Sequence, residues 1–234
     1  MSWVLANLPT IAGHLLAHLL QAVPAIIASF VLAIPIARLA RVARPLRAVL
    51  VTGSSLLYAI PSLALFVILP IILATGIRDP FNVIVALTLY GLALLVPATA
   101  DALDAVDARV LDAATAMGMG RLRCFLTVEL PLAGPAILTG LRVVTVSTIS
   151  LTTVGAVLGV RSLGWLFTDG FQRGVTAEIL TGLVSTAALA LILDGLVLAL
   201  GRLCLPWTWK RVGTSGAAVA GVGAATSGSQ EGKA

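Results

Sequence analysis

The chain has 234 residues, of which 59% are hydrophobic and 11% are charged, against roughly 45–50% and about 25% in soluble domains. A soluble domain of this size could not hide so much apolar surface, so composition excludes a soluble enzyme, a disordered protein and a disulfide scaffold. The net charge is +5, but its carriers are too sparse for a nucleic-acid-binding surface. Lipid is therefore expected to be the solvent for most of the chain.

Long apolar runs, bounded by charged or histidine side chains, divide the chain into candidate spans. A spanning helix needs about 20 apolar residues. Five runs approach or exceed this length, at residues 19–37, 48–77, 80–100, 143–160 and 179–201. We therefore predict an all-α membrane protein with about five transmembrane helices.

The second run, 48–77, is ambiguous. As one straight helix it would reach about 45 Å at 1.5 Å per residue, which is too long for one upright span and too short for two. Pro61 lies in its middle and should kink or break a helix there. We predict one span, entered through a broken or interfacial turn at Ser54–Pro61; whether residues 48–60 form a span, a broken helix or a turn stays open.

The distribution of Lys and Arg orients the spans. With five spans and the N-terminus outside, twelve of the 15 Lys and Arg residues fall in cytoplasmic segments, and only Arg78, Arg161 and Arg173 fall outside. Cytoplasmic loops carry such an excess. The sequence thus predicts an external N-terminus and a cytoplasmic C-terminus. It also predicts a membrane domain at 1–212 and a flexible cytoplasmic tail at 213–234, where Gly, Ala, Ser and Thr predominate.

One cytoplasmic connection, about 101–135, is much longer than the others. Its Ala, Leu, Met and Arg content favours helix. Asp101, Asp104 and Asp107 share one face near a helix start, where carboxylates are favoured by the helix dipole. Pro131 and Pro135 are expected to end the segment before the next span. A helical segment on the cytoplasmic side of a membrane domain is typical of a docking element.

A motif within this connection resembles a known family. Asp112-Ala113-Ala114, three residues, Gly118, nine residues, Val128, one residue, Leu130-Pro131 is similar to the EAA motif of ABC importer permeases, with Asp for Glu and Val for Ile. In that family the segment is the coupling helix, which docks into a cleft of the cytoplasmic ATPase. The small residues also suit close approach, and a glycine permits a turn after a short helix.

Other segments resemble the permeases for quaternary amines and osmoprotectants, a class that includes carriers of glycine betaine, choline and carnitine. They are Ala59–Ala64, Ile84–Pro97 and Gly159–Gly170. The resemblance covers roughly residues 14 to 205 and implies a type I importer permease of the MetI-like fold in a bacterial cytoplasmic (inner) membrane. It implies three partners: a cytoplasmic ATPase dimer, a second permease subunit (identical or paralogous) and an external solute-binding protein. The solute itself stays open.

The chain carries no phosphate-binding loop, and its only lysines are Lys210 and Lys233. We therefore expect no catalysis and no cofactor in this chain, with ATP and Mg used by the partner ATPase. Asp194 lies inside a predicted span, and such a residue either bonds a neighbouring helix or serves the solute path. Other candidates for that path are Tyr58, Pro61, Ser62, Phe66 and Tyr90.

His14 and His18 would share a helix face as zinc ligands can, but no third ligand is near in sequence, and we expect no metal and interfacial histidines. Three alternatives remain open for the chain. They are a permease for another small solute such as an amino acid, an intramembrane lipid-modifying enzyme using the aspartates at 101–112, and a non-transport scaffold.

Overall fold

The computed structural model describes residues 2–42 and 44–206, and the regular structure within these ranges is helical. The predicted tail at 213–234 lies outside them. The α-helices are α1 (Ser2–Ala6), α2 (Leu8–Val42), α3 (Arg44–Ala59), α4 (Ser62–Leu73), α5 (Pro80–Asp104), α6 (Ala108–Ala116), α7 (Arg121–Cys124), α8 (Leu130–Thr152), α9 (Trp165–Arg173) and α10 (Thr176–Cys204). A π-helix, η1 (Phe125–Glu129), precedes α8, and a 3-10 helix, η2 (Thr153–Leu158), follows it.

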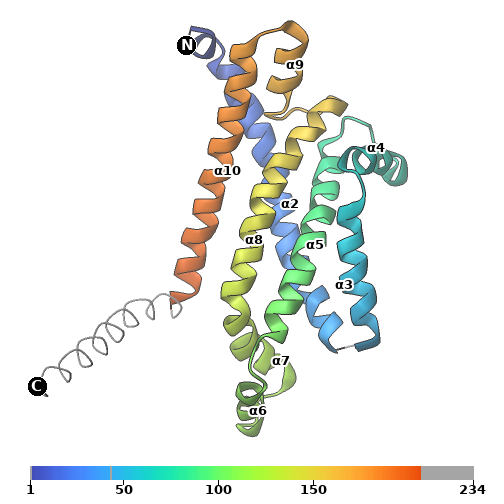
Figure 1. The fold of residues 1–234 in the computed structure, drawn as a ribbon, viewed down its shortest axis with the longest axis vertical. Helices are drawn as coiled ribbons and strands as arrows, with labels where there is room; N and C mark the ends of the chain where they lie inside the picture. The colour runs from blue at the N-terminus through green and yellow to red at the C-terminus, as the bar shows by residue number, and fades with distance from the viewer. Residues whose placement is uncertain (1, 43, 207–234) are drawn as a thin grey trace, which may run out of the picture.

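Four helical stretches of the described chain are long and apolar enough to cross a membrane, and a bent pair provides a fifth. The prediction of about five spans is therefore confirmed. Helices α2, α3, α5, α8 and α10 run side by side, with α4 and α9 at one end of the bundle and α6 and α7 at the other (Figure 1). We call these the α9 end and the α6 end. The three arginines predicted to be external all belong to segments at the α9 end.

Close packing of α2 against α5 forms the centre of the bundle. One face of α2 carries a stripe of small side chains with no exposed surface: Ala22, Ala25, Ser29, Ala33, Ala37 and Ala40. A Cβ placed on Gly91 of α5 would lie 2.1 Å from Ser29 Oγ, so only glycine fits there. Small residues at three- and four-residue spacing let helix backbones approach closely in lipid.

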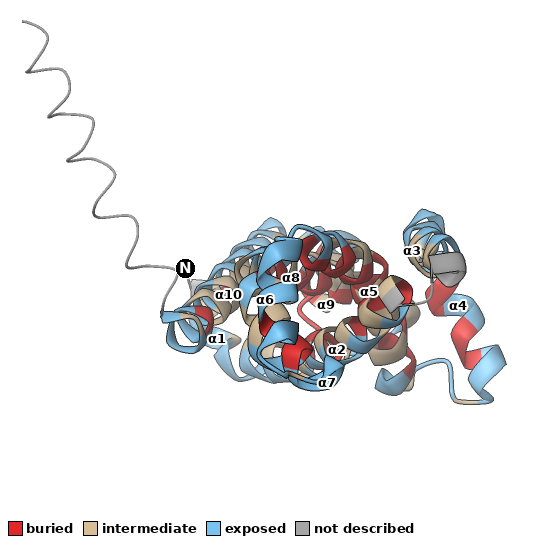
Figure 2. Cartoon of the chain, turned by 90° about the horizontal axis from the view of Figure 1, so that it is seen from below, coloured by how far each residue is buried: buried red, intermediate tan, exposed pale blue. Residues whose placement is uncertain are grey.

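The buried residues concentrate on the facing sides of α2, α5 and α8 (Figure 2). Seen from the α6 end, α3 and α4 stand on one side of this core, and α1 and α10 stand on the other. The outer faces of these flanking helices are apolar and exposed, as expected for surfaces in contact with lipid.

The break in the second run lies at Pro61, as predicted, but the order of its two parts is reversed. Helix α3 comes first, and its 16 residues span about 24 Å at 1.5 Å per residue. Helix α4 follows at a bend of 107° and lies at the α9 end. The turn therefore leaves the crossing helix instead of leading into it. Pro61 has extended backbone as the residue before α4, which explains the stop.

The fourth span begins earlier than predicted, and Pro131 and Pro135 do not separate it from the connection. Both prolines lie within α8, Pro131 in its first turn, directly after the π-helix η1. The π-helix η1 joins α7 to α8, so the helical stretch runs continuously from Arg121 to Leu158. Arg142, which the sequence predicts to lie in a cytoplasmic segment, is found well inside α8.

Arg142 is tolerated inside α8 because Asp194 of α10 faces it. Its Nε donates to Asp194 Oδ1 at 2.8 Å, and its Nη2 donates to Oδ2 at 2.7 Å. This two-point pairing joins α8 to α10 and satisfies both charges away from water. Of the two roles considered for Asp194, the bond to a neighbouring helix is the one observed.

Breaking this pair should destabilise the chain. We expect Arg142→Gln and Asp194→Asn each to lower the melting temperature in lipid nanodiscs by several degrees, because each leaves one charge without its partner. The double variant should recover part of the loss, since neither charge remains. Arg123→Gln, an exposed arginine ahead of α8, is the control. Losses that simply add in the double variant would contradict a direct pairing.

Candidate coupling site

Helix α6 projects from the bundle and carries the Asp-Ala-Ala part of the motif. Asp107 caps its start by accepting a hydrogen bond from the Arg109 backbone N–H at 2.9 Å. Hydrogen bonds from Arg109 also hold the pKa of Asp107 below its usual range. Asp112 and Ala113 are exposed, whereas Ala114 is buried against the rest of the chain. Helix α6 therefore presents one face outward and anchors the other.

Gly118 ends this helix in a conformation that requires glycine. Its φ is +81°, and its N–H donates to the Thr115 carbonyl at 2.9 Å. A Cβ on Gly118 would meet nothing within 4 Å, so the requirement is for backbone geometry and not for space within this chain. The neighbouring Met117 is 71% exposed. The turn after α6 thus leaves the apolar Met117 side chain and the space around Gly118 open to a partner.

A group of charged side chains fixes the base of this element to three helices. Arg41 of α2 forms an ion pair with Glu129 of η1, and its Nε lies 3.4 Å from Asp104 Oδ1 at the end of α5. Arg47 of α3 also pairs with Asp104. We call Arg41, Arg47, Asp104 and Glu129 the base cluster. No sequence pattern predicted this cluster, although arginines near the end of α2 and the start of α3 and acidic residues around the motif were a visible signal.

A cavity of about 380 Å³, lined by both charged and apolar side chains, lies between α6 and the base cluster. Arg38 and Arg41 line it from α2, and Arg121, Phe125 and Glu129 line it from the segment after α6. The Arg38 guanidinium lies 4.2 Å from the centroid of the Phe125 ring, a cation–π contact. The cavity therefore brings cationic groups to the base of α6.

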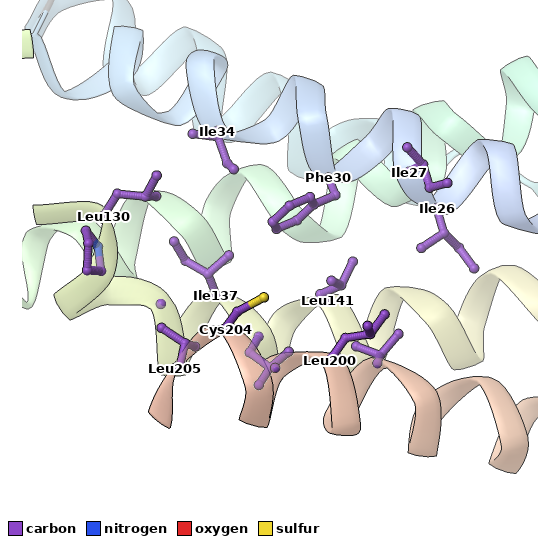
Figure 3. A pocket seen from close by; sticks show the side chains of 15 residues that line it. Ile26, Ile27, Phe30, Ile34, Leu130, Ile137, Leu141, Leu200, Cys204 and Leu205 are labelled. Atoms are coloured by element: carbon purple, nitrogen blue, oxygen red, sulfur yellow. The ribbon is translucent and has the colours of Figure 1, made fainter. Parts of the chain in front are cut away.

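The last three motif positions lie where the connection enters the bundle. Val128 belongs to η1, and Leu130 and Pro131 begin α8. Leu130 and Pro131 also line an apolar cavity of about 500 Å³ between α2, α8 and α10 (Figure 3). Hydrophobic side chains such as Phe30 and Leu200 surround it, so it cannot satisfy a hydrophilic solute. These motif residues therefore join α6 to a spanning helix.

Five of the six predicted path residues lie around the α3–α4 break. The Tyr90 hydroxyl donates to the Ile60 carbonyl at 2.7 Å, next to Pro61 and Ser62. The Tyr58 ring meets the Tyr90 ring edge to face at 6.0 Å. Phe66 and Tyr90 are buried in one hydrophobic cluster. Asp194 is not part of this group, since it faces Arg142.

The two N-terminal histidines, which the sequence predicts to be interfacial, are buried within the bundle. His18 has no exposed surface, and His14 stacks on Trp165 of α9 with ring centroids 4.7 Å apart. The contact between His14 and α9 joins residues that are far apart in sequence. Within residues 2–42 and 44–206, no group of three or more metal-ligating side chains comes together.

The sequence also matches a known protein family. The family of binding-protein-dependent transport system inner membrane components matches residues 25–204. The chain belongs to this family. The chain is therefore a membrane component of a transport system, and this confirms the resemblance seen in the motif.

Similar members of this family are named for the transport of related solutes. The choline transport system permease protein OpuBD of Bacillus subtilis is 30% identical over 84% of this chain and 86% of its own length. The glycine betaine/carnitine/choline permease protein OpuCD of the same organism is 30% identical over 76% of each chain. The osmoprotectant import permease protein OsmY of Salmonella typhimurium is 34% identical over 64% of this chain and 62% of its own.

Solved structures agree on the fold. A structure of the MetNI methionine ABC transporter in an inward-facing conformation matches with a TM-score of 0.69 and 21% identity, over 84% of this chain and 94% of that one. An amino acid ABC transporter matches with a TM-score of 0.67 and 17% identity, over 87% of this chain and 96% of that one. The MetI-like permease fold is therefore confirmed.

The base cluster should determine how firmly α6 is held. We expect Glu129→Gln to speed hydrogen exchange of the backbone amides at 107–119 several-fold, because Arg41 loses its partially buried partner. Arg109→Gln is the control, since its pair with Asp107 is solvent-exposed and such pairs contribute little. Equal exchange in both variants would contradict an anchoring role for Glu129.

Proposed function

We propose that this chain is the permease subunit of an ATP-driven importer for quaternary amines and osmoprotectants such as glycine betaine, choline or carnitine. The observation that carries the proposal is the exposed α6 with its Asp112-Ala113-Ala114 and Gly118 pattern, at the arginine-rich end of a family fold. Relatives named for these solutes at about 30% identity over most of both chains support the substrate class.

In this proposal the α6 end faces the cytoplasm of a bacterium and the α9 end faces outward. The retained excess of arginines at the α6 end supports this orientation. Two permease subunits, identical or paralogous, enclose the path in the cytoplasmic membrane. A cytoplasmic ATPase dimer supplies the energy and uses ATP and Mg, while this chain binds no cofactor and no nucleic acid. An external solute-binding protein delivers the solute.

The proposed coupling residues divide into two groups. Asp112, Ala113 and Gly118 form the docking surface, because the outward face of α6 and the turn after it are open, and the buried Ala114 holds α6 against the rest of the chain. Val128, Leu130 and Pro131 pass movement of this surface to α8, since they occupy the uninterrupted helical stretch into that span. ATPase closure would then move α8 and its neighbours as rigid bodies between outward- and inward-open states.

The proposed solute path lies beside the α3–α4 break. Tyr58, Pro61 and Ser62 are not buried within this chain, whereas Phe66 and Tyr90 form the packed wall behind them. Tyr58 is 50% exposed and offers an aromatic face to a passing quaternary ammonium group. So loose an arrangement suits weak, transient contact, with tight recognition left to the binding protein.

A charge at Gly118 should separate this chain from its ATPase. We expect Gly118→Asp to abolish co-purification of a P-loop ATPase from the native membrane, because a carboxylate would enter the docking cleft. Gly118→Asn is the matched control, since it has nearly the same shape and tolerates positive φ without charge; it should retain most of the ATPase. Full recovery of the ATPase with Gly118→Asp would contradict the docking role.

The substrate class has its own test. In proteoliposomes containing the complete importer and its binding protein, we expect ATP-dependent uptake of at least one of radiolabelled glycine betaine, choline and carnitine, and none of methionine. Uptake of methionine alone would show that the chain serves an amino acid importer of the same fold. Co-purification with lipid-synthesis enzymes and no ATPase would favour the enzyme alternative.

A further inference from the structure

A polar cavity of about 370 Å³ lies at the α9 end, opposite the coupling site. Three segments form it: the α4–α5 loop through Arg78, the end of η2 around Gly159, and α9 through Trp165, Thr168, Asp169 and Gln172. Its volume falls in the range of small-molecule sites. Its walls belong to the outer ends of α5 and α8, because Arg78 precedes α5 by two residues and η2 continues α8.

The cavity places a cation on one wall. Gly159 has φ +81°, and a Cβ there would lie 3.0 Å from Arg78 Nε. The absence of that Cβ lets the Arg78 side chain lie close against the turn. Arg78 forms no ion pair with the acidic side chains of the described residues. Its guanidinium is thus a donor suited to two-point pairing with a carboxylate.

The α9 wall of the cavity carries an aromatic ring and a carboxylate, which suit a cationic group. The Trp165 ring is fixed by its stack on His14, and Trp165 also lines the cavity. Asp169 supplies a carboxylate whose Oδ2 is held by Arg173 Nη1 at 2.9 Å. An aromatic ring next to a carboxylate attracts a quaternary ammonium group. Cation and anion partners thus line different walls of one small cavity.

The geometry points to this cavity as a weak outer binding site for a small zwitterion that carries a quaternary ammonium group and a carboxylate. The ligand's carboxylate pairs with Arg78, and its ammonium group lies against Trp165 and Asp169. This inference rests on the proposed function and deepens it, because it favours betaine-type solutes over a plain cation such as choline. A docking surface for the binding protein would be flatter and would not need both charges within one concave site.

The test measures direct binding to the full-length chain in lipid nanodiscs without the binding protein, by saturation-transfer NMR. The ligands are glycine betaine, choline, which lacks the carboxylate, and 3,3-dimethylbutanoate, which lacks the positive charge. We expect Arg78→Gln to weaken glycine betaine binding about tenfold, the loss typical of a charge-assisted hydrogen bond. Choline binding should not change, and 3,3-dimethylbutanoate should bind the unaltered chain more weakly than glycine betaine.

Arg161→Gln is the matched control, since Arg161 is an exposed arginine near the same end that does not line the cavity. Equal glycine betaine binding in the Arg78→Gln and unaltered chains would overturn the proposal, and so would an equal loss for choline. Loss of binding-protein capture with unchanged glycine betaine binding would also overturn it and would assign the surface to protein docking.

Uptake by the complete importer distinguishes failure of the proposed function from failure of the outer binding site. If the unaltered importer carries none of the quaternary amines, the proposed function fails together with this site. If it carries them, and Arg78→Gln lowers the maximal rate for glycine betaine but not for choline, the site is supported. If it carries them and the variant matches the unaltered importer in both binding and uptake, only the site proposal fails.

Discussion

The structure depends on how closely α2 can approach α5. In lipid, apolar side chains gain little by leaving their solvent, so packing must come from close contact between backbones. The small-residue stripe of α2, from Ala22 to Ala40, and Gly91 of α5 provide that contact. Ser29 Oγ also donates a hydrogen bond across this contact to the Thr88 carbonyl of α5 at 3.2 Å. With this pair fixed, α3 and α8 pack on its sides and set the position of both polar ends of the molecule.

Polar groups inside the bundle need partners within the protein, because lipid offers them none. These distant partners explain which features the sequence could predict and which it could not. The number of spans follows from apolar length, and the α6 motif follows from its spacing. The start of α8 does not, because Arg142 ends an apolar run when read alone. Only the distant Asp194 makes an arginine acceptable there. The burial of His14 depends likewise on Trp165, a contact that no local pattern encodes.

The α3–α4 break shows a finer limit of sequence reasoning. Proline predicts where a helix stops, so Pro61 located the break correctly. It does not say which of two apolar halves crosses the membrane. That choice depends on contacts: α3 packs along α2 and α5, whereas α4 packs on the first half of α5 and on η2. The Tyr90 hydroxyl then holds the turn through the Ile60 carbonyl.

The two polar ends are connected by helices that are continuous between them. Helix α5 begins two residues after Arg78 and ends at Asp104 of the base cluster. Helix α8 follows Glu129 and passes directly into η2, which lines the outer cavity. The base of α6 and the outer cavity are therefore joined through two spans. Because Arg78 and η2 lie at the far ends of different helices, any relative movement of α5 and α8 changes the distance between the cavity walls. Coupling at α6 and release of a weakly held solute at the α9 end would thus be one mechanical event.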